Sequence, residues 1–163
     1  MKAEYVNPFV ESVYELFVSM LNANARKGEV TLSTNNVKPR QLTALIGFSG
    51  PVRGMVAMSF PVNTALAMVS RLLGTQVLVV DDTVSDAVGE FVNIVSGAAK
   101  AKFSGDGPPI DLSLPTVVRG SGYVVDYPSR ARWLEVHFDS DLGPFSLQIT
   151  FETQQTAKEG GAP

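Results

Sequence analysis

The sequence predicts a mixed α/β domain of the α+β kind, in which two helix-plus-β-hairpin units share one sheet packed by two long helices. Two segments, residues 8–26 and 84–104, have apolar side chains at the spacing of amphipathic helices. Two pairs of alternating segments, each with Gly-Pro in its connection, are typical of β-hairpins. The order of helix, strand and hairpin over residues 8–60 recurs over residues 84–152. Two such units with a common core predict helices packed on a shared sheet.

The composition is that of one globular domain. The chain has 163 residues, of which 45% are hydrophobic and 18% charged. We expect the domain to span residues 1–152, and the small, polar residues 153–163 to form a disordered tail. The absence of cysteine excludes disulfides, thiolate metal sites and a cysteine nucleophile.

Charge and hydropathy bear on the class of partner. The net charge is −3 and the basic residues form no cluster, which argues against nucleic acid. No apolar run approaches the roughly 18 residues of a membrane span, and the N-terminus has no apolar signal segment. We therefore expect a soluble cytoplasmic protein.

The first helix is predicted over residues 8–26. Asn7 is placed to cap it, and Pro8 suits the first helical position, where no backbone donor is needed. Gly28 follows the last periodic residue, where a left-handed residue ends many helices. Loose alternation then predicts a strand over residues 29–37.

A β-hairpin and a short helix follow. Alternation predicts strands over residues 42–49 and 52–60, with a Gly-Pro turn between them. Asn63 is placed to cap the short helix, which runs to about Leu73 and ends at Gly74. The four apolar residues that come next, 77–80, are compatible with a strand or with a packed connection.

The central helix, residues 84–104, has two contrasting faces. Thr83 and Asp86 match a capping box at its start, and the glycines and prolines of residues 105–109 end it. Its core face consists of Val84, Val88, Phe91, Val92, Val95, Ala98 and Ala99. Its opposite face is a polar stripe that consists of Asp86, Glu90, Asn93, Gly97 and Lys100.

The last third of the chain is predicted to be β-structure. Residues 110–114 and 116–119 form strand segments broken at Pro115. A second hairpin is predicted over residues 132–138 and 145–152.

Several familiar kinds of catalytic and metal site find no support. His137, the only histidine, is interpreted as a surface or edge-strand side chain, since no G-x-S-x-G segment supports a Ser-His-Asp triad. The aspartates at 81 and 82 are better explained by a helix N-terminus than by a metal ion. Those at 139 and 141 are better explained as turn residues than as calcium ligands. We expect no metal ligands in this chain.

Glu90 and Asn93 are the remaining candidates for chemistry. Three residues apart in a helix, they project side by side and present an acid and an amide together. Asn93 and Gly97 are poor helix formers, and a glycine in mid-helix costs about 1 kcal/mol relative to alanine. Two unfavourable choices on one face favour a functional surface, with a solvated helix face as the plain alternative.

The residues from Ser85 to Ala99 resemble the E-x-x-N-x-x-x-G signature of the CheC/CheX/FliY phosphatases, which act on the phosphorylated chemotaxis response regulator CheY. The opening segment 7–12, the hairpin from Ala44 to Phe60 and the segment Leu112–Gly120 are similar to the CheX branch of that family. The first helix lacks the acid–amide pair, because Glu15 is followed by Val18. A single pair is also typical of CheX-like members.

The resemblance implies the CheC-like/CheX-like fold, a homodimer and a catalytic role for two residues. Asn93 would orient the attacking water, and Glu90 would pair with the active-site lysine of the response regulator. Gly97 would give clearance, with Asp86 and Lys100 as rim contacts. Mg²⁺ is expected on the partner receiver domain, with no cofactor on this chain. The alternative is a receiver-domain or flagellar-switch adaptor that binds through the same helix face without hydrolysis.

Overall fold

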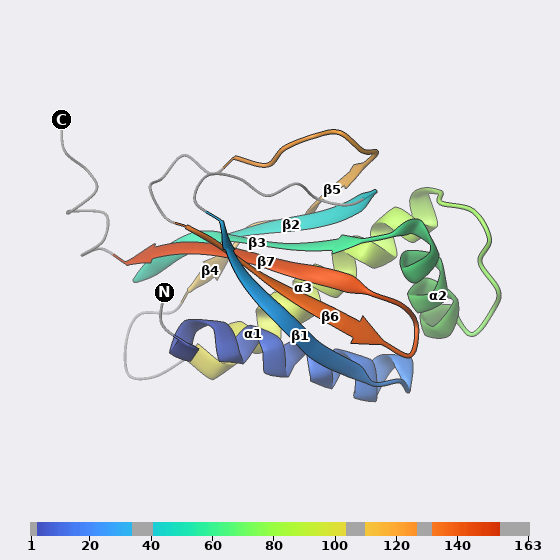
Figure 1. Ribbon diagram of the computed structural model, residues 1–163, viewed down its shortest axis with the longest axis horizontal. Coiled ribbons are helices and arrows are strands. Elements are labelled where there is room, and N and C mark those ends of the chain that lie inside the picture. Colours follow the sequence, from blue (N-terminus) through green and yellow to red (C-terminus); the bar gives the residue numbers. More distant parts are fainter. Residues whose placement is uncertain (1–2, 34–40, 104–109, 127–131, 154–163) are drawn as a thin grey trace.

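A single sheet with helices packed on it makes up the protein, as a computed structural model of residues 3–33, 41–103, 110–126 and 132–153 shows (Figure 1). Its helical elements are α1 (Ala3–Leu16), the π-helical turn η1 (Phe17–Leu21), α2 (Val62–Leu73) and α3 (Asp82–Phe103). Its strands are β1 (Ala25–Ser33), β2 (Leu42–Ser49), β3 (Val52–Phe60), β4 (Asp111–Leu112), β5 (Thr116–Arg119), β6 (Trp133–Ser140) and β7 (Phe145–Thr153). The mixed α/β prediction is confirmed.

The sheet places strands from the two ends of the chain side by side. Its order is β1-β6-β7-β3-β2-β4, with β5 also paired to β2, and every pair is antiparallel. The helix α1 brings Phe9 to ring contacts with Phe48 of β2 and Phe103 of α3. In α3, Phe91 meets Phe60 of β3. The two long helices therefore share one core with a single sheet face.

The predicted and observed strands agree best where alternation and a Gly-Pro turn occur together. β2 and β3 have the predicted bounds. The second hairpin begins and ends one or two residues away from the prediction, and Thr153, expected in the tail, extends β7. Of the predicted strand 110–114, only Asp111 and Leu112 pair with β2. Residues 77–80 form no strand and connect α2 to α3.

The prediction for the first helix was wrong at both ends. Helix α1 begins at Ala3, so that Asn7 and Pro8 lie inside it. The extra turn is held by tertiary contact, since the Tyr5 ring centroid lies 4.8 Å from that of Phe151. At the other end, η1 closes with Asn22 in the left-handed conformation (φ 47°), and Gly28 lies in β1. The strand starts at Ala25, and residues 34–37 of the prediction lie outside the described residues.

The other two helices differ from prediction mainly at their caps. Helix α2 starts at Val62 after Pro61, and Gly74 ends it in the left-handed conformation (φ 69°), as predicted. Helix α3 starts at Asp82, and its cap is the Asp81 carboxylate, which accepts a hydrogen bond of 3.0 Å from the Val84 amide. Thr83 lies within the helix and is not the cap. Asp81 satisfies one of the amides that a helix start leaves without an intrahelical partner.

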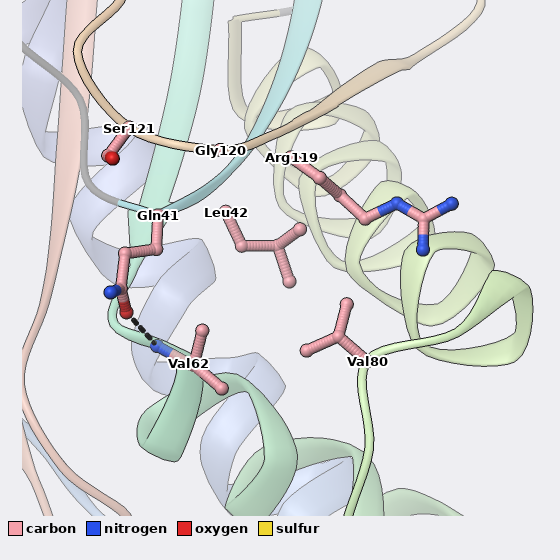
Figure 2. Close-up of a pocket in the computed structure, with 7 residues that line it drawn as sticks. All are labelled: Gln41, Leu42, Val62, Val80, Arg119, Gly120 and Ser121. Atoms are coloured by element: carbon pink, nitrogen blue, oxygen red, sulfur yellow. Dashed lines mark hydrogen bonds between the residues drawn. The ribbon is translucent and has the colours of Figure 1, made fainter.

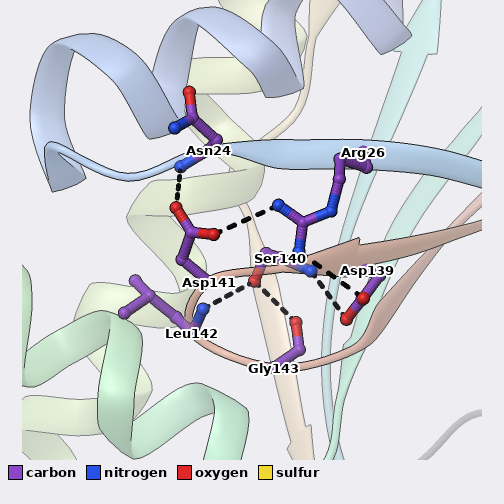
Figure 3. A network of polar contacts seen from close by, with 7 residues as sticks. All are labelled: Asn24, Arg26, Asp139, Ser140, Asp141, Leu142 and Gly143. Atoms are coloured by element: carbon purple, nitrogen blue, oxygen red, sulfur yellow. Dashed lines mark hydrogen bonds and ion pairs between the residues drawn. The ribbon is translucent and has the colours of Figure 1, made fainter.

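A polar network fastens the start of β1 to the β6–β7 turn (Figure 3). The Asp141 carboxylate accepts a hydrogen bond of 2.9 Å from the Asn24 amide and another of 3.1 Å from Arg26. Arg26 also reaches Asp139 at 3.5 Å. The Asn24 amide and the Arg26 guanidinium hold the pKa of Asp141 below its ordinary value. Asp141 is a turn residue, as the sequence predicts, whereas Asp139 lies in β6 and pairs with Arg26 of β1.

Substitution of Asp141 with Asn is expected to lower the melting temperature at pH 7. Because the folded-state pKa of Asp141 is depressed, its contribution to stability is present above the unfolded pKa of about 4. That contribution is lost as the pH falls through the lower folded-state value. The gap between wild type and Asp141→Asn should therefore narrow between neutral pH and pH 3 in thermal melts. A gap that stays constant over this range would contradict the assignment.

Candidate functional site

The polar stripe lies on the side of α3 that faces away from the sheet. Asp86, Glu90 and Gly97 are exposed, and Asn93 and Lys100 are partly exposed. The predicted core face is buried apart from Ala98, which is half-buried. All five stripe residues belong to one helix, so the fold brings them together without any long-range contact.

The side chains of Glu90 and Asn93 are not engaged by their neighbours. Within the described part of the chain, neither makes a hydrogen bond or an ion pair through its side chain. By contrast, Asp82 at the start of the same helix forms an ion pair of 3.2 Å with Arg119 of β5. A carboxylate and an amide that stabilise nothing within the fold are available to another molecule. The pair supplies one anionic acceptor and one group that both donates and accepts hydrogen bonds.

Two glycines of α3 have opposite surroundings. A Cβ on Gly97 would meet no atom within 4 Å, so the helix surface is open there. A Cβ on Gly89 would lie 3.2 Å from Val117 Cγ2 and 3.8 Å from Pro115 Cγ. Gly89 thus allows β5 and the segment before it to lie close to the helix, at the residue before Glu90. This contact was not predicted from the sequence, although a glycine in mid-helix is a signal of close approach.

A pocket of about 370 Å³ lies at the N-terminal end of α3, away from Glu90 and Asn93 (Figure 2). Its floor is apolar, and Figure 2 shows Arg119 extending along one side of it. The lining residues are Gln41, Leu42, Val62, Val80, Arg119, Gly120 and Ser121. Pockets are the default site for small ligands, but this one contains no member of the polar stripe. The candidate pair lies instead on a convex helix face, which suits a macromolecular partner.

His137 has a serine and an acid beside it in the sheet. Its Nδ1 is 3.4 Å from Ser146 Oγ, and its Nε2 is 3.0 Å from Glu135 Oε1. Ser146 is only 2% exposed, so no substrate reaches its hydroxyl. The hydrogen bond to that hydroxyl is also long. The interpretation of His137 as a structural side chain on the sheet surface holds, although β6 is an inner strand.

The acidic pair at the start of α3 has a structural role. Asp81 caps the helix, and Asp82 pairs with Arg119 of β5. In the described ranges, no group of three or more His, Cys, Asp or Glu side chains is arranged to hold a metal ion. None of the helices that the structure describes is long and apolar enough to cross a membrane.

Comparison with known proteins identifies the family. Residues 42–139 match the family model of the chemotaxis phosphatase CheX. The chain is 31% identical to the CheY-P phosphatase CheX of Thermotoga maritima over 121 residues, which are 74% of this chain and 78% of that protein.

Solved structures support the same assignment. A CheC-like superfamily protein from Shewanella has a TM-score of 0.84 and 29% identity, over 93% of this chain and 99% of that chain. CheX in the CheX–CheY–BeF3–Mg²⁺ complex of Borrelia burgdorferi shares the fold, with a TM-score of 0.78 and 22% identity over 93% of this chain and 99% of that one. The chain therefore belongs to the CheX family of chemotaxis phosphatases.

Proposed function

We propose that this protein is a phosphatase that accelerates hydrolysis of the aspartyl phosphate of a CheY-like response regulator, with Glu90 and Asn93 as its catalytic residues. The observation that carries the proposal is the unengaged acid–amide pair on the exposed face of α3, in a chain of the CheX family. The name of the T. maritima relative, CheY-P phosphatase, supports the reaction and the substrate.

Asn93 acts by positioning. Hydrolysis of an aspartyl phosphate needs a water oxygen in line with the bond from phosphorus to the aspartate oxygen. The amide of Asn93, inserted beside the phosphoryl group, hydrogen-bonds that water and holds it in line. A bond then forms from the water oxygen to phosphorus as the bond to the aspartate oxygen breaks. The products are a carboxylate and inorganic phosphate; one proton of the water stays on the transferred oxygen, and the other passes to another phosphate oxygen or to solvent.

Glu90 acts by docking. Its carboxylate pairs with the active-site lysine of the receiver domain and thereby fixes the register of α3 against the partner. Asp86 and Lys100 lie at the two ends of the same stripe and make contacts at the rim. The receiver supplies its own Mg²⁺, so this chain needs no metal ligands. We further propose a cytoplasmic location, and the homodimer implied by the family resemblance stays a prediction.

Phosphate release from a phosphorylated CheY-like receiver tests the proposal. We expect the wild-type protein, in substoichiometric amounts with Mg²⁺ present, to shorten the lifetime of the phosphoryl group and to turn over many times. A receiver that binds the protein and keeps its unassisted lifetime would instead establish the adaptor. The presence of both the acid and the amide favours catalysis, because an adaptor has no need of Asn93.

Substitution of Gly97 distinguishes an effect on the close approach of the receiver from an effect on folding. Gly97→Ala should raise the free energy of unfolding by roughly 0.5–1 kcal/mol, because its Cβ meets open space and alanine favours the helix. Gly97→Leu should also fold, but should lower kcat/KM about tenfold, since the added side chain would occupy the space in which the receiver packs, and overpacking of a close-packed contact costs about 1–3 kcal/mol. Asn7→Leu, at an exposed site of α1, is the matched control. Full activity in Gly97→Leu would show that the receiver does not approach this turn.

A further inference from the structure

We propose that Leu114, on the edge segment between β4 and β5, is an apolar contact for the response regulator beside the Glu90–Asn93 pair. The inference rests on the proposed function, and it extends the docking surface from one helix face to a neighbouring edge of the sheet. It assigns part of the affinity for the receiver to a residue outside the polar stripe.

The backbone around Leu114 contains one residue more than the strand beside it. Leu45 of β2 pairs with Thr116, and Phe48 pairs with Leu112. Two residues of β2 therefore lie opposite the three residues 113–115. Such a bulge directs a side chain away from the regular alternation of a strand, and bulges are frequent at sheet edges and next to active sites.

The bulge is held on both sides. The Ser113 amide donates to the Gly47 carbonyl at 2.9 Å, and the Ser113 hydroxyl accepts from the Gly47 amide at 2.9 Å. On the other side, Pro115 packs over Gly89. The segment is thereby fixed at the residues immediately before and after Leu114.

The side chain held in this way is turned to solvent. Leu114 is 87% exposed, which makes it the most exposed of the large hydrophobic side chains in the described structure. A single exposed leucine is ordinary. A leucine presented by a fixed bulge next to a candidate site is different, because little conformational entropy is lost when a partner covers it.

The position of the bulge decides what covers Leu114. Pro115 contacts α3 at Gly89, the residue before Glu90 and one helical turn before Asn93. A stable interface buries about 800 Å² on each partner, which exceeds one helix face, so a receiver that places its phosphoaspartate over Asn93 also covers the edge segment packed on Gly89. Because the active site of the receiver is polar, the apolar Leu114 side chain contacts the rim around that site. Leu114 then contributes to binding and takes no part in the reaction.

Kinetics of Leu114 variants test this role. Leu114→Ala should raise KM for the phosphorylated receiver at least about fivefold, as for a moderate hot spot, and leave kcat unchanged, because the lost contact is uniform binding. Leu114→Met should retain the wild-type KM. Neither change should alter the melting temperature, since the side chain is exposed.

Leu78 provides a matched control. It is 71% exposed and lies in the α2–α3 connection, beyond the N-terminal end of α3 (Figure 1). By helical rise, Asn93 lies about 16 Å from Asp82, the first residue of that helix. Leu78→Ala should leave both kcat and KM unchanged.

The failures of the two proposals are distinct. A wild-type protein that does not accelerate phosphate release overturns the proposed function. A wild-type protein that does so, together with a Leu114→Ala variant of unchanged KM, overturns the role of Leu114 alone. An equal rise of KM in Leu78→Ala also overturns it, because loss of any exposed leucine would then have the same effect.

Discussion

Replacement of Asn93 with alanine is expected to reduce kcat for receiver dephosphorylation by roughly 10²-fold, the loss that follows when a reacting group is no longer held in place. KM should change little, because the docking contacts of Glu90 and the rim remain. The reaction then proceeds at a rate near that of the receiver alone. Phosphate release at saturating receiver concentration measures the effect.

A thermal melt of Asn93→Ala distinguishes that loss from misfolding. Asn93 is only partly buried and makes no side-chain hydrogen bond within the described structure. Alanine is the better helix former, by up to about 0.7 kcal/mol. Asn93→Ala should therefore melt at or above the wild-type temperature. Asn7→Ala, at an exposed site of α1, should show the same gain in stability and full activity. Wild-type kcat in Asn93→Ala would rule out the water-orienting role.

Replacement of Glu90 with glutamine is expected to act on binding. The loss of one partner from a hydrogen-bonded charge pair costs 2 kcal/mol or more, so KM should rise roughly 30-fold. The dependence of KM on salt should become less steep, since one attractive pair is gone. The fall in kcat should be smaller than for Asn93→Ala, because Asn93 still holds the water once the complex has formed.

Asp86→Asn is the matched control for Glu90. It removes one negative charge from the same stripe, one helical turn earlier, at a site that is also exposed. As a rim contact, it should change KM by less than about threefold. If the two variants raised KM equally, general attraction between the stripe and the receiver would explain the effect, and the specific pair with the receiver lysine would be wrong.

The arrangement of the candidate site could be predicted because it depends on one helix. The members of the polar stripe are related by helical periodicity alone, so their common face followed from residue spacing. The bounds of β2 and β3 could be predicted equally well, since alternation fixes the buried side of each strand and Gly-Pro fixes the turn. In these elements the local pattern and the tertiary packing favour the same structure.

Other features depend on contacts between distant parts of the chain. Helix α1 begins at Ala3 because Tyr5 meets Phe151, a residue near the other end of the chain. The close approach at Gly89 and the bulge at Leu114 depend on how β4 and β5 pair with β2. No local pattern contains that register. The cap at Asp81 was missed for a different reason, because Thr83 and Asp86 offered a competing signature two residues later.

The lifetime of the phosphoryl group inside the complex distinguishes a phosphatase from an adaptor. A phosphorylated receiver is mixed with excess protein and Mg²⁺, and complex formation and phosphate release are followed in the same sample. We predict that wild type and Asn93→Ala bind alike, and that only wild type shortens the lifetime. A wild-type complex in which the receiver keeps its unassisted lifetime would contradict this account, and α3 would then be the docking helix of an adaptor.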